Sequence, residues 1–136
     1  MIERDEFERE LRAVCAAYGV SVIPYSPLAG GFLTGKYRKD KPLPESVRAK
    51  GLRHALIDKN YSLIELMDAI GKAHQATVGQ VALAWMLADP VITSPIIGPN
   101  TISQLKDNLG ALDVLLTTEE KESLDQATRW QKPENE

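Results

Sequence analysis

Three glycines and a lysine, clustered behind an apolar segment, are the residues of this sequence with the clearest chemical use. Residues 20–37 read VSVIPYSPLAGGFLTGKY and contain Gly30, Gly31, Gly35 and Lys36. Backbone without side chains lets amide groups approach an anion closely, and a neighbouring ammonium adds the opposite charge. The pattern therefore predicts a loop that holds a phosphate.

A second segment of the same kind follows later in the chain. Residues 91–108 read VITSPIIGPNTISQLKDN, an apolar run that leads through a Gly-Pro-Asn turn into a helical pattern. The first turn of a helix at 101–109 offers unpaired amides and a positive dipole end to an anion. Two such loops in one short chain indicate a ligand with two anionic or polar ends.

Two familiar phosphate motifs fit the first loop poorly. The stretch GGFLTGKY matches G-x-x-x-x-G-K, but Tyr37 stands where a P-loop needs Ser or Thr for magnesium. Residues 26–29 also separate the apolar segment from the first glycine, and the only candidate acidic strand, ALID at 55–58, is short. The dinucleotide fingerprint G-x-G-x-x-G does not occur in the sequence. Both motifs are disfavoured.

Candidates for acid–base, nucleophilic or metal chemistry are few. His54 falls in a basic loop and His74 near a helix end, where surface positions are expected. Cys15 lies on an apolar stripe and is predicted to be a core residue. One cysteine allows neither an internal disulfide nor a CxxC metal site, and no G-x-S-x-G motif occurs. The sequence predicts no catalytic set and no metal site.

The composition is that of an ordinary globular domain. The 136 residues are 43% hydrophobic and 26% charged, with a net charge of −3. A protein without a basic face is not expected to bind nucleic acid. No apolar run approaches the roughly 20 residues that span a bilayer, and MIERDEFERE lacks a signal-peptide pattern. We therefore expect a cytoplasmic protein with no membrane partner.

Helical patterns alternate with two extended segments, 20–25 and 91–97. Residues 3–18 predict an amphipathic helix that Gly19 ends, with an apolar stripe formed by Phe7, Leu11, Val14, Cys15 and Tyr18. Four capping-box patterns predict further helix starts, at Ser62–Glu65, Thr77–Gln80, Thr101–Gln104 and Thr117–Glu120.

The predicted helices differ in what they bury. The first of the four should bury Leu63, Leu66, Met67 and Ile70. The second, VGQVALAWMLA, is apolar almost all round and should be buried or at an interface. The last runs from 117 to about 130. Residues 38–60 lack periodicity, carry seven Lys and Arg, and predict a long mobile loop.

This order of elements predicts an α/β fold with a parallel sheet. Two strands alone form a marginal sheet, and parallel strands need both faces covered. The chain is therefore expected to be part of a larger α/β layer.

At YSPLAGGFLTGKY and SPIIGPNTISQLKDNLGAL, the chain resembles the aldo-keto reductase family. The stretch TVGQVALAWMLADPVITSPIIG is similar to that family's last helix and eighth strand, and the likeness covers about residues 2–130. The resemblance implies part of a (β/α)₈ TIM barrel, with 20–25 as strand seven and 91–97 as strand eight. Residues 1–136 would form the C-terminal half-barrel, with 38–60 as a mobile basic loop within it.

The resemblance also implies the residues of a dinucleotide site. Tyr25 would stack on the nicotinamide, and Lys36 would pair with the phosphates as the loop closes. The implied cofactor-binding residues are Tyr25, Ser26, Pro27, Leu28, Gly30, Lys36, Arg48, Gly98, Asn100, Gln104, Asp107 and Asn108. Two simpler roles stay open, because Gln104 can serve its capping box and Tyr25 can be a barrel-layer residue.

The implied cofactor is NADP, with NAD as an alternative. Asn100 stands where many relatives carry Arg or Ser, and a neutral amide holds a 2′-phosphate less strongly. The family's catalytic Asp, Tyr, Lys and His precede the matched region, so the resemblance transfers no catalytic residue.

We therefore expect the C-terminal cofactor-binding portion of an NADP-dependent aldo-keto reductase that reduces aldehydes or ketones. The isolated chain is expected to be inactive, and a carbonyl substrate should bind only when the barrel is completed. One alternative is a non-catalytic nucleotide-binding or assembly module that associates with itself or with a complementing chain. Another is a truncation product without a function.

Overall fold

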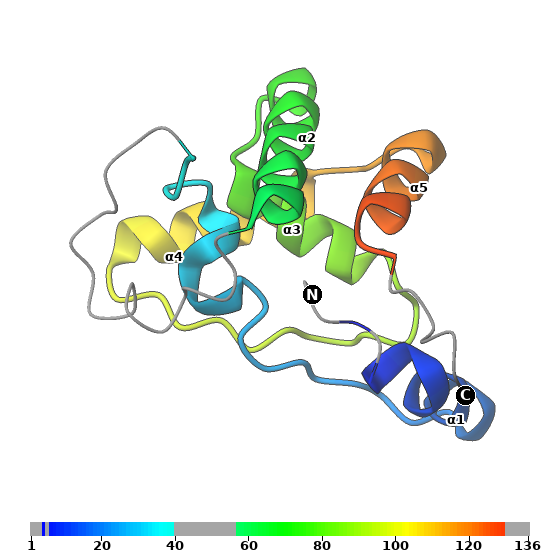
Figure 1. The fold of residues 1–136 in the computed structure, drawn as a ribbon. Coiled ribbons are helices and arrows are strands. Elements are labelled where there is room, and N and C mark those ends of the chain that lie inside the picture. The colour runs from blue at the N-terminus through cyan, green and yellow to red at the C-terminus, as the bar shows by residue number, and fades with distance from the viewer. Residues whose placement is uncertain (1–3, 5, 40–56, 130–136) are drawn as a thin grey trace.

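Two extended segments run side by side beneath a group of helices (Figure 1). The computed structural model describes residues 4, 6–39 and 57–129 of the chain. Its helical elements are η1 (Phe7–Leu11), α1 (Arg12–Tyr18), η2 (Ala29–Thr34), α2 (Asp58–His74), α3 (Val78–Leu87), α4 (Ile102–Leu109), η4 (Gly110–Asp113) and α5 (Thr118–Ala127). Helices α2, α3 and α5 lie on one side of the extended pair, with α4 near one end and α1 near the other (Figure 1).

The two extended segments are parallel, as the sequence predicted. Val22 pairs with Ile92 and Tyr25 with Ile96, each in an isolated parallel bridge. The amide of Ile96 donates to the carbonyl oxygen of Pro24 at 2.9 Å. Regular strands over 20–25 and 91–97 are not formed within the described residues. One reason is that Pro24 has no N–H to extend the ladder.

The first helix ends where predicted, but it begins later than predicted, since residue 4 is not helical and Phe7–Leu11 form the π-helix η1; its burial also differs from the prediction. Gly19 ends α1 in the left-handed conformation, with φ 64°. Cys15 is buried, as expected for a core residue. Leu11, Val14 and Tyr18, which complete the predicted stripe, are 54%, 50% and 79% exposed. The described residues thus cover only the edge of this apolar face.

Helix α3 forms the centre of the core, and its burial on nearly every side confirms the prediction from its apolar sequence. Side chains from η2, α2 and α5 pack around it. The core cluster consists of Phe32, Leu33, Tyr37, Leu63, Ile64, Met67, Ile70, Val78, Val81, Ala82, Trp85 and Leu124. Leu66 packs against this cluster from a partly buried position.

The capping boxes of α3 and α5 are both present, whereas the predicted box at Ser62 is wrong. Helix α2 begins a turn earlier, at Asp58, and Ile57 precedes it without any side-chain cap. Ser62 lies inside the helix and donates its hydroxyl to the carbonyl oxygen of Asp58. The reason is tertiary packing, since Asn60 is buried and the Tyr61 ring packs 6.0 Å from another aromatic ring of the core.

The predicted basic loop is therefore shorter than 38–60, because α2 includes its last three residues. Residues 40–56, which hold His54, lie outside the described part of the chain. At the start of the predicted loop, Arg38 donates to the Asp68 carboxylate of α2 at 2.9 Å.

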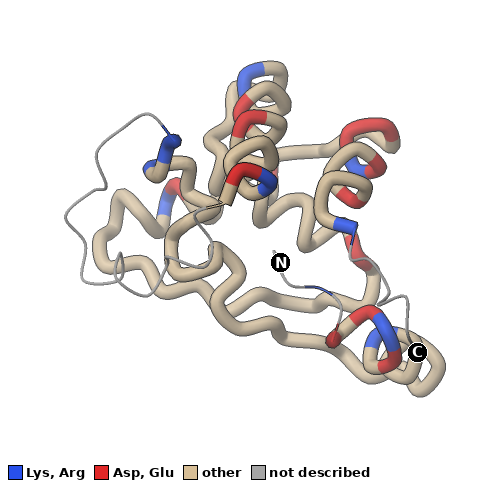
Figure 2. Tube along the Cα trace, in the orientation of Figure 1, with Lys and Arg blue, Asp and Glu red and all other residues tan. Residues whose placement is uncertain are grey.

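Charged side chains gather on the helices and avoid the extended pair (Figure 2). Residues 20–35 and 90–105 contain no Asp, Glu, Lys or Arg. Uncharged segments flanked by charged helices are the pattern of a sheet layer that is covered on both faces.

Asp125 joins three parts of the chain through its carboxylate. It accepts hydrogen bonds from the indole nitrogen of Trp85 at 2.9 Å and from Lys121 at 2.7 Å. Arg4 also donates to it at 3.2 Å, and the guanidinium of Arg4 lies 5.1 Å from the centroid of the Trp85 ring. The N-terminal segment is thereby held to α3 and α5.

His74 connects α2 with α5 and is only partly exposed, although a surface position was expected. Its Nε2 lies 2.9 Å from both carboxylate oxygens of Glu120. Glu120 also accepts the Thr117 amide in the capping box of α5.

A second carboxylate, Asp89, holds α1 to the second extended segment. Arg12 donates to its two oxygens at 2.7 and 3.0 Å, and the Val91 amide donates at 3.1 Å. Burial alone would raise the pKa of Asp89. The hydrogen bonds from Arg12 and Val91, together with the charge of Arg12, lower this pKa below its ordinary value.

Replacement of Asp89 by Asn should reduce the acid sensitivity of the fold. Because the pKa of Asp89 is lowered in the folded chain, its stabilisation is present above the ordinary Asp pKa and is lost as the pH falls through the lower, folded value. We expect Asp89→Asn to cost about 1 kcal/mol at pH 7, a modest figure because Arg12 is 39% exposed. Its unfolding free energy should also fall less than that of wild type between about pH 5 and 2.

Urea unfolding across this pH range measures both effects. Glu122→Gln, a change at an exposed α5 residue, serves as the control. Equal pH slopes for Asp89→Asn and wild type would contradict the assignment.

Candidate functional site

The glycine loop, residues 26–36, leaves the first extended segment through a left-handed turn. Ala29, Gly30 and Gly31 have φ values of 48°, 64° and 96°. Glycine adopts this conformation without strain, whereas a residue with a Cβ pays roughly 1–2 kcal/mol. Phe32 and Leu33, both fully buried, anchor the loop to the core. The loop is therefore shaped by its glycines and fixed from below.

The amides of this loop are partly engaged within it. Gly31 donates to the carbonyl oxygen of Leu28 at 2.9 Å, and Gly30 donates to the Ser26 hydroxyl at 3.3 Å. The loop also carries Lys36, whose Nζ lies 5.1 Å from the centroid of the Tyr37 ring. In this structure the glycines set the path of the loop, and Lys36 supplies its positive charge.

The second loop leads into α4, whose first turn is capped by side chains. The Thr101 hydroxyl accepts the Gln104 amide at 3.1 Å, as the capping-box pattern predicted. The side chain of Gln104 does not complete that box. Its Oε1 accepts the amide of Asn100 at 2.7 Å, one residue before the expected partner. The acceptor of Gln104 thus has a local role without any ligand.

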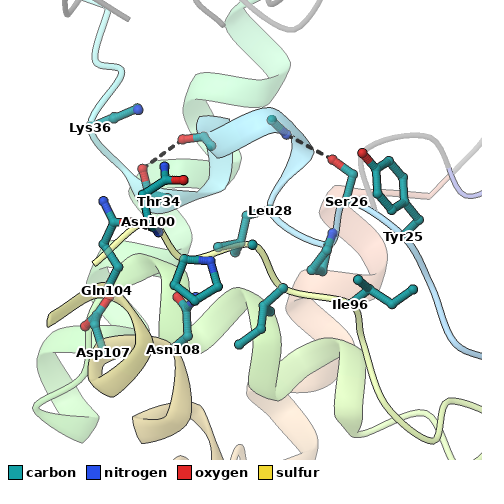
Figure 3. A pocket seen from close by; sticks show the side chains of 16 residues that line it. Tyr25, Ser26, Leu28, Thr34, Lys36, Ile96, Asn100, Gln104, Asp107 and Asn108 are labelled. Atoms are coloured by element: carbon teal, nitrogen blue, oxygen red, sulfur yellow. Dashed lines mark hydrogen bonds between the residues drawn. The ribbon is translucent and has the colours of Figure 1, made fainter. Parts of the chain in front are cut away.

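The two loops enclose one cavity of about 520 Å³, and Figure 3 shows its lining side chains. The parallel pairing brings these loops to the same end of the extended segments. The lining residues are Tyr25, Ser26, Pro27, Leu28, Gly30, Gly31, Thr34, Lys36, Ile96, Ile97, Gly98, Pro99, Asn100, Gln104, Asp107 and Asn108.

Every predicted cofactor-binding residue that the structure describes lines this cavity; Arg48 lies outside the described residues. Gly31, Thr34, Ile96, Ile97 and Pro99 also line it and were not predicted. Their positions, inside the glycine loop or at the end of the second segment, were the available signal.

The cavity has distinct ends. Tyr25 and Ile96 lie at one end, whereas Gln104 and Asp107 lie at the other (Figure 3). Tyr25 is 85% exposed, so its ring face is accessible to a ligand. Among the described lining residues, Lys36 provides the positive charge and Asp107 the negative charge. The cavity therefore offers an aromatic surface, a cation and a polar helix terminus to one elongated ligand.

The described residues contain no group of three or more His, Cys, Asp or Glu that could hold a metal ion. Within the same part of the chain, no helix has the length and apolar character needed to cross a bilayer.

Comparison with known proteins identifies the family. The model of the Aldo/keto reductase family matches residues 1–129, so the chain belongs to this family. A probable aldo-keto reductase 1 of Glycine max is 38% identical over 114 residues, which are 82% of this chain and 33% of the relative. The aldo-keto reductase yakc [NADP(+)] of Schizosaccharomyces pombe is 35% identical over 119 residues, which are 85% and 34% of the two chains.

A solved structure gives the same result. The thermostable aldo-keto reductase Tm1743, crystallised with the inhibitor epalrestat, superposes with a TM-score of 0.65 at 28% sequence identity. The match covers 93% of this chain and 36% of Tm1743. The chain thus spans about a third of the length of the curated relatives it matches. Its fold is consistent with part of the (β/α)₈ barrel of this family.

Proposed function

We propose that the cavity binds a nicotinamide dinucleotide, NADP(H) in preference to NAD(H). The chain would serve as the C-terminal cofactor-binding portion of an aldo-keto reductase that reduces aldehydes or ketones. The observation that carries this proposal is that two glycine-containing loops, far apart in sequence, line one cavity. Its volume of about 520 Å³ is within the range of small-molecule sites.

The nicotinamide, the phosphates and the adenosine end of the dinucleotide would each contact a suitable group along the cavity. The exposed ring of Tyr25 offers a stacking surface for the nicotinamide. Lys36 offers a charge-assisted bond to the phosphates, and the start of α4 offers its dipole to the adenosine end. Such binding fixes the nicotinamide near Tyr25, from where a hydride can pass to a carbonyl held by the rest of a barrel.

The preference for NADP rests on a relative and on the helix start. The S. pombe relative is named as an NADP(+) enzyme. In this chain, Asn100 can donate to a 2′-phosphate but brings no positive charge to it. Binding of NAD(H), which lacks the 2′-phosphate, is therefore the competing outcome. The cytoplasmic location likewise stays a prediction from the sequence.

Removal of the Lys36 ammonium should weaken dinucleotide binding. We expect Lys36→Ala to raise the Kd for NADPH by about tenfold or more, because a hydrogen bond to a charged group is worth roughly 1.5–3 kcal/mol. Isothermal titration calorimetry at fixed salt measures the change. Lys106→Ala is the matched control, since Lys106 lies on α4 but does not line the cavity. Equal losses in the two variants would contradict a local role for Lys36.

The chain by itself should not reduce carbonyl compounds, because the resemblance places the family's catalytic residues before the matched region. Purified 136-residue protein, incubated with NADPH and a panel of aldehydes and ketones, should show no carbonyl-dependent loss of absorbance at the NADPH band. Measurable turnover that persists after repurification would contradict this expectation.

A second candidate is an assembly module, and exposed apolar side chains on the extended pair favour it. Val20 and Ile23, which do not line the cavity, are 53% and 59% exposed. In a (β/α)₈ barrel such side chains are covered by the other strands. We propose that this surface accepts further chain of the same barrel type, either from a second copy or from a complementing polypeptide.

A charge on this surface should reduce association. Sedimentation velocity should show concentration-dependent association of the wild-type chain, and Ile23→Asp should shift the distribution toward monomer. Leu115→Asp is the control, because Leu115 is 81% exposed and belongs to neither extended segment. A wild-type chain that is monomeric at every concentration would count against the assembly module. If the chain is a truncation product without a function, it should not bind NADPH, and the calorimetric titration described above would show this.

A further inference from the structure

The first turn of α3 contacts both segments that line the cavity, the glycine loop and α4. On one side, a Cβ built on Gly35 of the glycine loop would lie 2.9 Å from the Cγ2 atom of Val78. Gly35 has a φ of 76°, so glycine meets both the conformation and the close contact. The glycine loop therefore rests directly on the start of α3.

On the other side, the start of α3 holds α4 through hydrogen bonds. The Gln80 side chain donates from Nε2 to the carbonyl oxygen of Asp107 at 2.8 Å. The Thr77 hydroxyl donates to the Asp107 carboxylate at 3.2 Å. A Cβ on Gly110, just after α4, would clash with Gln80 Nε2, so the two helices approach closely here.

These hydrogen bonds matter because α4 itself has no buried residue, and its other support is η4, which follows it directly and buries Ala111. Its apolar side chains Ile102, Leu105 and Leu109 are 75%, 40% and 50% exposed. A helix without a buried face takes its position from its polar contacts and its chain connections. The carbonyl oxygen of Asp107, in the last turn of α4, also accepts from the Gly110 amide, so Gln80 adds a second hydrogen bond to the same oxygen.

Gln80 performs two tasks with one amide. Its Oε1 accepts the Thr77 amide at 2.9 Å and so completes the capping box of α3. Its Nε2 makes the bond to Asp107. The capping box of α5 has Glu120 in the equivalent place, so a carboxylate can also accept the N-cap amide there. Only the bond to Asp107 requires the amide nitrogen.

We propose that Gln80 is a positioning residue for the dinucleotide, an inference that rests on the proposed function. By fixing Asp107, it sets the distance between α4 and the glycine loop, and hence the span of the cavity. Gln80 does not line the cavity itself. It acts through Gln104, Asp107 and Asn108, which do.

The test exchanges the amide for a carboxylate. Gln80→Glu keeps an acceptor for the Thr77 amide but loses the donor to Asp107. We expect the Kd for NADPH to rise about tenfold, while the urea midpoint changes little. Gln80→Met, which removes both the donor to Asp107 and the acceptor for the Thr77 amide without adding charge, should weaken binding as well, and by a factor that does not depend on salt concentration. Glu120→Gln makes the reverse exchange in the other capping box and should leave NADPH affinity unchanged.

Paired substitutions distinguish positioning from general loss of structure. In the wild-type background, Gln104→Ala and Lys36→Ala should each weaken NADPH binding. In the Gln80→Glu background, Gln104→Ala should add little, because α4 is already displaced, whereas Lys36→Ala should keep its full effect. Equal effects of Gln104→Ala in both backgrounds, or an unchanged NADPH affinity of Gln80→Glu, would overturn this inference but leave the proposed function intact. A wild-type chain that does not bind NADPH would overturn the proposed function and this inference together.

Discussion

The parallel pairing of two short extended segments is the constraint on which the site depends. Because Val22 pairs with Ile92 and Tyr25 with Ile96 in the same direction, both segments end at the same edge. The loops that follow them must then meet there, although much of the chain separates them. Helix α3 supports this arrangement from one side, since it is buried against the core and its first turn contacts both loops. The cavity is thus a consequence of chain direction and of one apolar helix.

Much of the fold could be predicted because local patterns agree with the tertiary structure. The capping boxes at Thr77 and Thr117 formed because each of these residues stands directly before the helix start that its pattern predicts. The box at Ser62 failed because the burial of Asn60 favours an earlier helix start. Periodicity predicted the burial of Cys15, but it does not reveal which neighbours are present to cover the rest of an apolar stripe. Contacts such as that of Asp125 with Trp85 join distant residues and leave no local signal.

The candidate site was more predictable than the contacts that hold it. The glycine loop and the second loop carry sequence signals of their own, and the resemblance to the family implied individual binding residues within them. The structure unites the described ones around one cavity. The side-chain partners of Gln104 and Gln80 were not predictable. Each glutamine belongs to a capping-box pattern, yet Gln104 bonds the amide of Asn100 and Gln80 also bonds Asp107. Such choices depend on distances of tenths of an ångström that residue types do not encode.

The central claim is that the two loops act as one dinucleotide clamp. Titration of the ¹⁵N-labelled chain with NADPH, followed by amide chemical shifts, tests it most directly. The account predicts saturable shifts in both loops, from Ser26 to Lys36 and from Gly98 to Asn108, with one common Kd and little change in α5. Shifts confined to one loop, different Kd values for the two loops, or no shifts at all would contradict it.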